Sequence, residues 1–209
     1  LNPISAHVPL QEMLEDIDKV IADYKAIGCE YIVVPYVTEE RRPGGELFMQ
    51  MIEEIRAIGE KAKAAGLVLL YHNHDFEFKK LESGEYGLDY LYANVPADLL
   101  QTELDQCWVK CSGLEPVEYL KKYADRIKML HIKDEFVIGE SGKINFEGIF
   151  KQFYKNGYSD FVVEIETPRD LRNKTNADGS KYTQDQIAAE MFEAAKKSAQ
   201  YLQNAKFVK

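Results

Sequence analysis

The chain has 209 residues, of which 45% are hydrophobic and 29% are charged, a composition typical of a globular protein with one substantial core. Its net charge of −9 argues against a nucleic-acid partner, because phosphate binding needs a basic surface. No apolar run reaches the roughly 18–20 residues that a membrane span requires. We therefore expect no nucleic-acid partner and no membrane segment.

Three cysteines, Cys29, Cys107 and Cys111, are present without the spacing of a disulfide framework. An odd number of scattered cysteines is typical of reduced thiols, and residues 1–30 lack the basic-then-apolar layout of a signal peptide. These observations predict a cytoplasmic protein. Cys107 and Cys111 lie close to Asp105 in the sequence, but we favour packing over a functional role for them.

Six apolar runs predict six β-strands along the chain. From the second run onward they are spaced as in repeated strand–helix units. The runs cover residues 4–8, 31–34, 67–71, 99–104, 127–132 and 161–165.

The segments between the runs have the periodicity of amphipathic helices. A first helix over residues 10–24 is expected to end at Gly28, and a longer one over 47–62 at Gly66. Pro116 suits the first turn of a later helix, and Asn145 can cap the next. Residues 86–94 predict a short helix.

The last predicted helix opens with a capping box formed by Thr183 and Gln186. Its inward face is expected to carry Ile187, Met191, Ala195 and Leu202. Continuous apolar strands that alternate with such helices predict a parallel sheet covered by helices, in a single domain over residues 1–209. Residues 167–182 are the longest polar stretch and predict a loop over the active face, either a lid or the arm of a homo-oligomer.

Chemically reactive side chains stand at the ends of the predicted strands. Because alternate strand residues share a face, His72 points with His74, His131 with Lys133, and Glu164 with Glu166. Strand C-termini of a parallel α/β sheet meet on one face, where ligands bind. His7 and Asp105 end two further strands.

This collection predicts a divalent metal site, with Mn, Mg, Co or Zn as the ion. Such ions need carboxylate and imidazole ligands and an open position for substrate, and Asp105, His131 and Glu164 supply that mixture. The fourth ligand is expected from the preceding strand or its loop. His72, His74 and Glu77 compete for that place, and Glu77 would complete a set of two Glu, one Asp and one His.

Four stretches of the chain resemble the sugar phosphate isomerase/epimerase group, the xylose isomerase-like TIM barrels of the AP endonuclease family 2 superfamily. They are Leu-Leu-Tyr-His-Asn-His-Asp-Phe-Glu-Phe at 69–78, Leu-Asp at 104–105 with Trp108, Leu-His-Ile-Lys-Asp at 130–134, and Val-Val-Glu-Ile-Glu at 162–166. The resemblance implies an eight-stranded (β/α)8 barrel, of which this chain holds strands three to eight. It also implies that an N-terminal part has been removed, or that another chain covers the gap, and we favour the former.

The resemblance further implies four metal ligands from strands five to eight. Asp105, His131 and Glu164 match that pattern, whereas His72-Asn73-His74 occupies the place of the first glutamate and favours a His ligand there. Trp108 replaces a histidine that ketose 3-epimerases carry three residues after the Asp. Both departures favour a relative that acts on another sugar, a cyclitol or a keto-glycoside.

The predicted activity is proton transfer next to a carbonyl through an enediolate, as in a sugar isomerase or epimerase. His74 or His72 would act as the base, and Glu164 would return the proton. Lys133 would hold a substrate oxygen, with His7, Trp108 and Glu166 also expected near the substrate, and Asp134 and Glu166 fit orienting roles. The alternatives are a dehydratase or lyase with the same site and a non-catalytic sugar-binding relative. The charge argues against the endonucleases of this fold.

Overall fold

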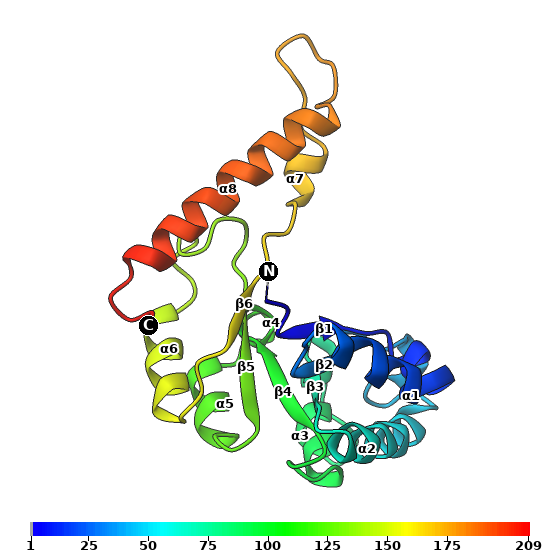
Figure 1. Cartoon of the computed structure of the whole chain (residues 1–209). Helices are drawn as coiled ribbons and strands as arrows, with labels where there is room; N and C mark the ends of the chain where they lie inside the picture. Colours follow the sequence, from blue (N-terminus) through cyan, green and yellow to red (C-terminus); the bar gives the residue numbers. More distant parts are fainter. Residues whose placement is uncertain (1) are drawn as a thin grey trace.

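The computed structural model describes residues 2–209, and its strands form a single parallel sheet that curls into a half-barrel (Figure 1). The strands are paired in chain order, which confirms the predicted parallel sheet and fits a partial TIM barrel. Three of the six begin where the sequence predicts, at residues 31, 127 and 161. The strands are β1 (Ser5–His7), β2 (Tyr31–Val34), β3 (Val68–His72), β4 (Gln101–Asp105), β5 (Ile127–Ile132) and β6 (Phe161–Val163).

Helices follow the strands as expected, and two more appear that were not predicted. Gly28 and Gly66 have positive φ angles of 91° and 78° just beyond the first two helices, and this conformation favours glycine. The additional helices are α4 and α7. The helices are α1 (Leu10–Ala26), α2 (Phe48–Ala64), α3 (Gly87–Asn94), α4 (Gln106–Cys111), α5 (Pro116–Lys122), α6 (Phe146–Lys155), α7 (Arg169–Arg172) and α8 (Gln184–Asn204), with 3-10 turns η1 (Glu39–Arg41) and η2 (Phe76–Phe78).

The core has two parts because alternate strand residues point to opposite faces of the sheet. A large cluster joins one face of the strands to the helices, for example Ile32 and Leu69 to Ile55. A small cluster occupies the other, concave side and consists of Tyr31, Val33, Leu70 and Met129. The curl of the sheet therefore brings the strand C-termini to face one another, with this small apolar cluster packed below them.

One residue that was predicted on the inward face of helix α8 does not lie there. Ala195 is exposed, and the helix packs on the body through Ala194, Ser198 and Leu202 instead. Ser198 Oγ accepts a hydrogen bond from the Ile138 N–H, and this bond fixes which face turns inward. The predicted capping box at the start of the helix is present.

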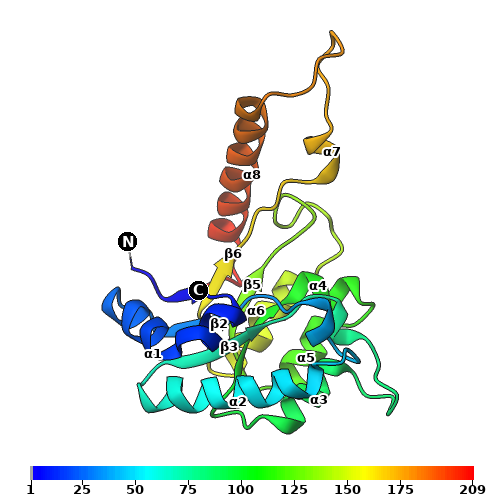
Figure 2. The same ribbon diagram turned by 90° about the vertical axis from the view of Figure 1, so that its right-hand side faces the viewer.

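The segment 167–182, which contains α7, forms an arm together with the first half of α8 (Figure 2). It extends away from the sheet, on the side of the strand C-termini (Figures 1 and 2). It is not entirely a loop, because it contains α7 and an antiparallel bridge between Thr175 and Lys181. In the described part of the chain, no helix combines the length and apolar composition that crossing a membrane would need.

Candidate functional site

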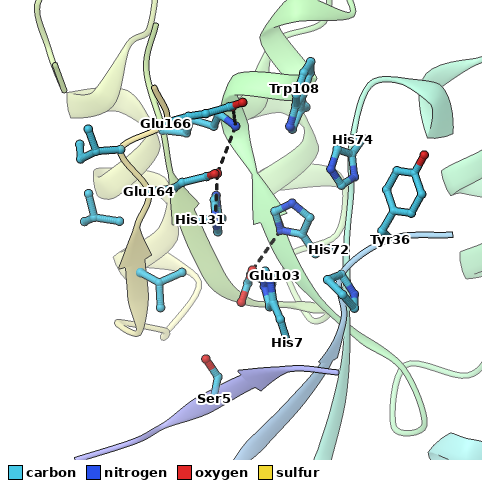
Figure 3. A pocket seen from close by; sticks show the side chains of 15 residues that line it. Ser5, His7, Tyr36, His72, His74, Glu103, Trp108, His131, Glu164 and Glu166 are labelled. Carbon is cyan, nitrogen blue, oxygen red and sulfur yellow. Dashed lines mark hydrogen bonds and ion pairs between the residues drawn. The ribbon is translucent and has the colours of Figure 1, made fainter. Parts of the chain in front are cut away.

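A cavity of about 820 Å³ lies at the C-terminal ends of the strands (Figure 3). Most of the side chains expected there are brought together in its lining. They are His7, His72, His74, Trp108, His131, Lys133, Glu164 and Glu166. Asp105 lies directly beneath this lining and is fully buried. The strand-end pattern thus does place reactive groups from β1, β3, β4, β5 and the segment after β6 around one space.

Asp105 is fixed by the helix that follows it. Its Oδ1 accepts hydrogen bonds from the backbone N–H groups of Cys107 (2.8 Å) and Trp108 (3.0 Å), so the carboxylate caps α4. Its other oxygen, Oδ2, is buried and has no hydrogen-bond partner among the described residues. One oxygen is therefore structural, and the other is left for the site.

Two histidines approach the free oxygen of Asp105. His131 Nδ1 lies 3.1 Å from Oδ2 and His72 Nε2 lies 4.0 Å from it. His131 Nδ1 is likewise buried without a well-formed hydrogen bond within the described chain. Glu164 Oε2 lies 3.7 Å from the other nitrogen of His131. Buried polar atoms rarely stay unpaired, so this arrangement of His72, Asp105 and His131 fits a divalent cation.

Glu103 joins the site although sequence reasoning missed it. This buried β4 residue accepts hydrogen bonds from His7 Nε2 (2.7 Å) and His72 Nδ1 (3.0 Å) at its Oε1 (Figure 3). Burial alone would raise the pKa of Glu103, but the hydrogen bonds from the two histidines outweigh it and lower the pKa to about 2. In the sequence, the feature that could have pointed to Glu103 is its position two residues before Asp105, which places both side chains on the same face of the strand.

His74 stands among aromatic rings at one rim of the cavity (Figure 3). Its ring centroid lies 5.4 Å from Phe76, 5.5 Å from Tyr36 and 5.6 Å from Trp108. Burial, assisted by the nearby His72, lowers the pKa of His74 to about 4. The imidazole is therefore neutral at pH 7 and can accept a proton.

Lys133 forms ion pairs with both glutamates that follow β6. Its Nζ lies 3.1 Å from Glu164 Oε2 and 2.7 Å from Glu166 Oε2, and 5.2 Å from the centre of the Trp108 ring. Burial would lower the pKa of Lys133, but hydrogen bonds to Glu166 and Glu164 raise it. The lysine therefore remains a cation at the mouth of the site, where an anionic or hydroxyl oxygen of a ligand could bind.

The structure does not bring Glu77 to the proposed ligand group. Glu77 lies in η2, where its two oxygens accept hydrogen bonds from the Tyr71 hydroxyl (2.7 Å) and the His74 backbone N–H (2.8 Å). Burial raises its pKa to about 7. The tight turn folds Glu77 beneath the loop after β3 instead of into the cavity, whereas His72 and His74, the other two candidates for the fourth ligand, both line the cavity.

Asp134 also has a different role from the one expected. Its carboxylate accepts hydrogen bonds from the backbone N–H groups of Glu135 (2.8 Å) and Gly139 (2.9 Å). These bonds close the turn after β5, and no hydrogen bond between Asp134 and Lys133 is present among the described residues. Glu166, by contrast, does contact Lys133, as the predicted orienting role requires.

The family model of the xylose isomerase-like TIM barrel matches residues 5–198. The chain belongs to this family. Two solved structures of a sugar phosphate isomerase/epimerase from Parabacteroides distasonis resemble it. One has a TM-score of 0.81 and 29% identity and covers 100% of this chain and 74% of that one. The other has a TM-score of 0.73 and 31% identity and covers 96% and 68%.

The curated relatives of this chain are named as dehydratases and not as isomerases or epimerases. An inosose dehydratase of Clostridium perfringens is 26% identical over 148 residues, which is 60% of this chain and 48% of that protein. The chain spans about half the length of the curated relatives that it matches. The two groups of relatives thus differ in the reaction that their names state.

Proposed function

We propose that this protein is a metal-dependent enzyme that moves a proton on a carbon next to the carbonyl of a sugar or cyclitol ketone. The observation that carries the proposal is the pair of unpartnered buried atoms, Asp105 Oδ2 and His131 Nδ1, at the C-terminal strand ends. His72 Nε2 lies 4.0 Å from Asp105 Oδ2, and Glu164 Oε2 lies 3.7 Å from the other nitrogen of His131, so carboxylate and imidazole groups border the same space. The two atoms lie 3.1 Å from each other without hydrogen-bond geometry, and buried polar atoms usually have a partner, which a cation between these groups would supply.

His72, Asp105, His131 and Glu164 would hold the ion. When bound, a divalent cation stabilises the negative charge that develops on substrate oxygens. His72 is chosen over Glu77 because its Nε2 faces Asp105, whereas both oxygens of Glu77 are already occupied. This choice also agrees with the departure from the family pattern at positions 72–74.

His74 is the proposed base. It lines the cavity, its Nδ1 has no hydrogen-bond partner among the described residues, and the low pKa of its imidazole keeps it neutral at pH 7. Glu164 lies across the cavity, on the segment after β6, and would return the proton from the other face of the substrate (Figure 3). Lys133 would hold a substrate oxygen by a charge-assisted hydrogen bond.

Two outcomes are open to a substrate after the first proton is removed. Return of the proton gives isomerisation or epimerisation, in line with the name of the Parabacteroides distasonis structures. Loss of a hydroxyl from the next carbon gives dehydration, and the similarity to inosose dehydratases favours this second candidate. A substrate that is a sugar or cyclitol ketone serves either reaction.

One experiment tests the proposal and separates the two reactions. The purified chain is treated with EDTA, reloaded with Mn²⁺, Mg²⁺, Co²⁺ or Zn²⁺, and incubated with inosose and a set of sugar ketones in D₂O. We expect deuterium to enter the carbon next to the carbonyl only in metal-loaded samples, with loss of water marking a dehydratase. Activity that is insensitive to chelation, with no metal in the protein, would reject the metal site.

Two variants assign the roles within this assay. His131→Ala should lose both bound metal and deuterium exchange. His74→Ala should keep the metal and lose the exchange, because His74 is proposed as the base and not as a ligand. Equal metal loss in both variants would show that His74 is a ligand.

A further inference from the structure

Glu103 is a fully buried carboxylate that connects three strands of the sheet. From β4 it accepts hydrogen bonds from His72 on β3 and from His7 on β1, both at the same oxygen. A buried carboxylate costs free energy unless its partners compensate for the lost hydration. Glu103 lies on the face of β4 that lines the site, two residues before Asp105. This position indicates that the buried carboxylate has a role in the site and does not only pack in the core.

The bond from Glu103 decides how His72 carries its proton. A neutral imidazole has one N–H and one lone pair, and the hydrogen bond at one nitrogen determines which nitrogen has the proton. Glu103 is a carboxylate acceptor 3.0 Å from His72 Nδ1, so the proton belongs on Nδ1. The lone pair is then on Nε2, the nitrogen that lies 4.0 Å from Asp105 Oδ2.

We propose that Glu103 is a positioning residue that fixes His72 with its proton on Nδ1 and its lone pair on Nε2, facing Asp105 and His131. Carboxylates commonly orient metal-binding histidines in this way and increase their basicity. The tautomer part of the proposal stands on the hydrogen bonds alone, whereas the part about metal affinity rests on the proposed metal site.

His7 provides a matched comparison for the same carboxylate. It donates to the same oxygen of Glu103 over 2.7 Å but lies on the edge strand β1, and 42% of its side chain is exposed. Replacing His7 by Phe removes one hydrogen bond to Glu103 and leaves the bond to His72. Replacing Glu103 by Leu removes both, and Glu103→Gln keeps an acceptor oxygen without the charge.

The test reads the tautomer of His72 directly. Long-range ¹H–¹⁵N correlation spectra of the metal-free, histidine-labelled chain contain signals from four histidines, and His72→Gln identifies one of them. We expect the Nδ1–H form of His72 in the unmodified chain, in H7F and in E103Q, and a mixture of forms in E103L. An Nε2–H form in the unmodified chain, or an unchanged tautomer in folded E103L, would overturn the proposal.

Metal affinity is the second readout. Titration with Mn²⁺ should give a Kd about 10–100-fold weaker in E103L than in the unmodified chain, with H7F nearly unchanged and E103Q in between. Equal weakening in H7F and E103L would overturn a specific role through His72. If E103L does not fold, the spectra of the unmodified chain and E103Q decide. If no variant and no unmodified chain binds metal, the proposed function fails while the spectra still decide the tautomer.

Discussion

The central strands and the edge strands contribute differently to this site. The C-terminal ends of β3, β4 and β5 are buried, and the side chains of His72, Asp105 and His131 are at most 7% exposed. The edge strands β1 and β6 are partly exposed along their length. The side chains of His7 and Glu164, from or just after these strands, are 42% and 40% exposed.

The difference indicates that the surrounding core fixes the positions of the central side chains. The edge side chains depend instead on contacts with other residues of the site. Among the central side chains, Asp105 is held by backbone N–H groups at the start of α4 and His72 by the buried side chain of Glu103. The edge side chains are held by hydrogen bonds with side chains from the central strands: His7 donates to Glu103, and Glu164 accepts from Lys133. We therefore expect substitutions in the centre to remove the site, and those at the edges to weaken it.

The largest effect is expected for Asp105→Asn. The amide cannot supply the charge that a divalent cation needs, but its oxygen can still accept the hydrogen bonds from the start of α4. Mn²⁺ affinity should fall by more than about 100-fold, beyond the usual cost of losing a residue that only orients a ligand. Isothermal titration measures this change.

Asp105→Ala separates the two roles of this carboxylate. It should lose the metal equally and also lose about 1 kcal/mol of unfolding free energy, because the cap of α4 disappears. The stability of Asp105→Asn should stay close to that of the unmodified chain. Metal affinity within about threefold of the unmodified value in either variant would contradict a ligand role for Asp105, since that difference is below 1 kcal/mol.

The second effect compares the same substitution in a central and an edge strand. Val33 on β2 is fully buried on the concave side, whereas Val163 on β6 is 42% exposed. Val33→Thr should lose about 1–3 kcal/mol, because a hydroxyl is buried among apolar side chains. Val163→Thr should change stability by less than about 0.5 kcal/mol. Urea unfolding measures both, and equal losses would show that the edge is as tightly packed as the centre.

The same contrast explains what could be predicted from the sequence. The β-branched runs and their spacing predicted the parallel sheet, and strand alternation predicted that His72 points with His74 and His131 with Lys133. Glu103 was missed because its spacing from Asp105 shows that the two share a strand face, but not that the carboxylate is buried or which residues it contacts. Its partners come from β1 and β3, and only the tertiary fold brings them together.

The expectation for Ala195 was wrong, and Glu77 has contacts other than those expected, each for a local reason. Glu77 was expected at the metal because of its residue type, but the η2 turn directs it to Tyr71 and the His74 backbone. Ala195 was expected inside because it continues the helical spacing of Ile187 and Met191, but the adjacent Ala194 is buried instead. A single hydrogen bond from Ile138 to Ser198 makes that choice.

The third effect tests the edge contribution to the metal site. Glu164→Gln should weaken Mn²⁺ binding by about tenfold, or about 1.4 kcal/mol, because this carboxylate is partly exposed and shares its charge with Lys133. Glu166→Gln is the matched control, since Glu166 contacts Lys133 and Arg172 and no proposed ligand. A loss for Glu164→Gln as large as that for Asp105→Asn would remove the distinction between centre and edge.

The smallest effect concerns Glu77, a buried carboxylate beneath the central strand β3. Burial raises its folded-state pKa from an ordinary value of 4.5 to about 7. The protonated acid therefore stabilises the fold fully below about pH 4.5, and this contribution is lost as the pH rises through about 7. Relative to Glu77→Gln, the unmodified chain should lose stability between about pH 5 and about pH 8, as measured by urea unfolding at both values.

The exposed Glu82, which lies in the same connection between β3 and α3, supplies the control for this comparison. Glu82→Gln should follow the unmodified chain at both pH values, because an exposed carboxylate pays no burial cost that ionisation could change. If Glu77→Gln also follows it, ionisation of Glu77 is not opposed by its surroundings. The hydrogen bonds from Tyr71 and the His74 backbone would then compensate fully for the burial of the Glu77 carboxylate beneath the loop after β3.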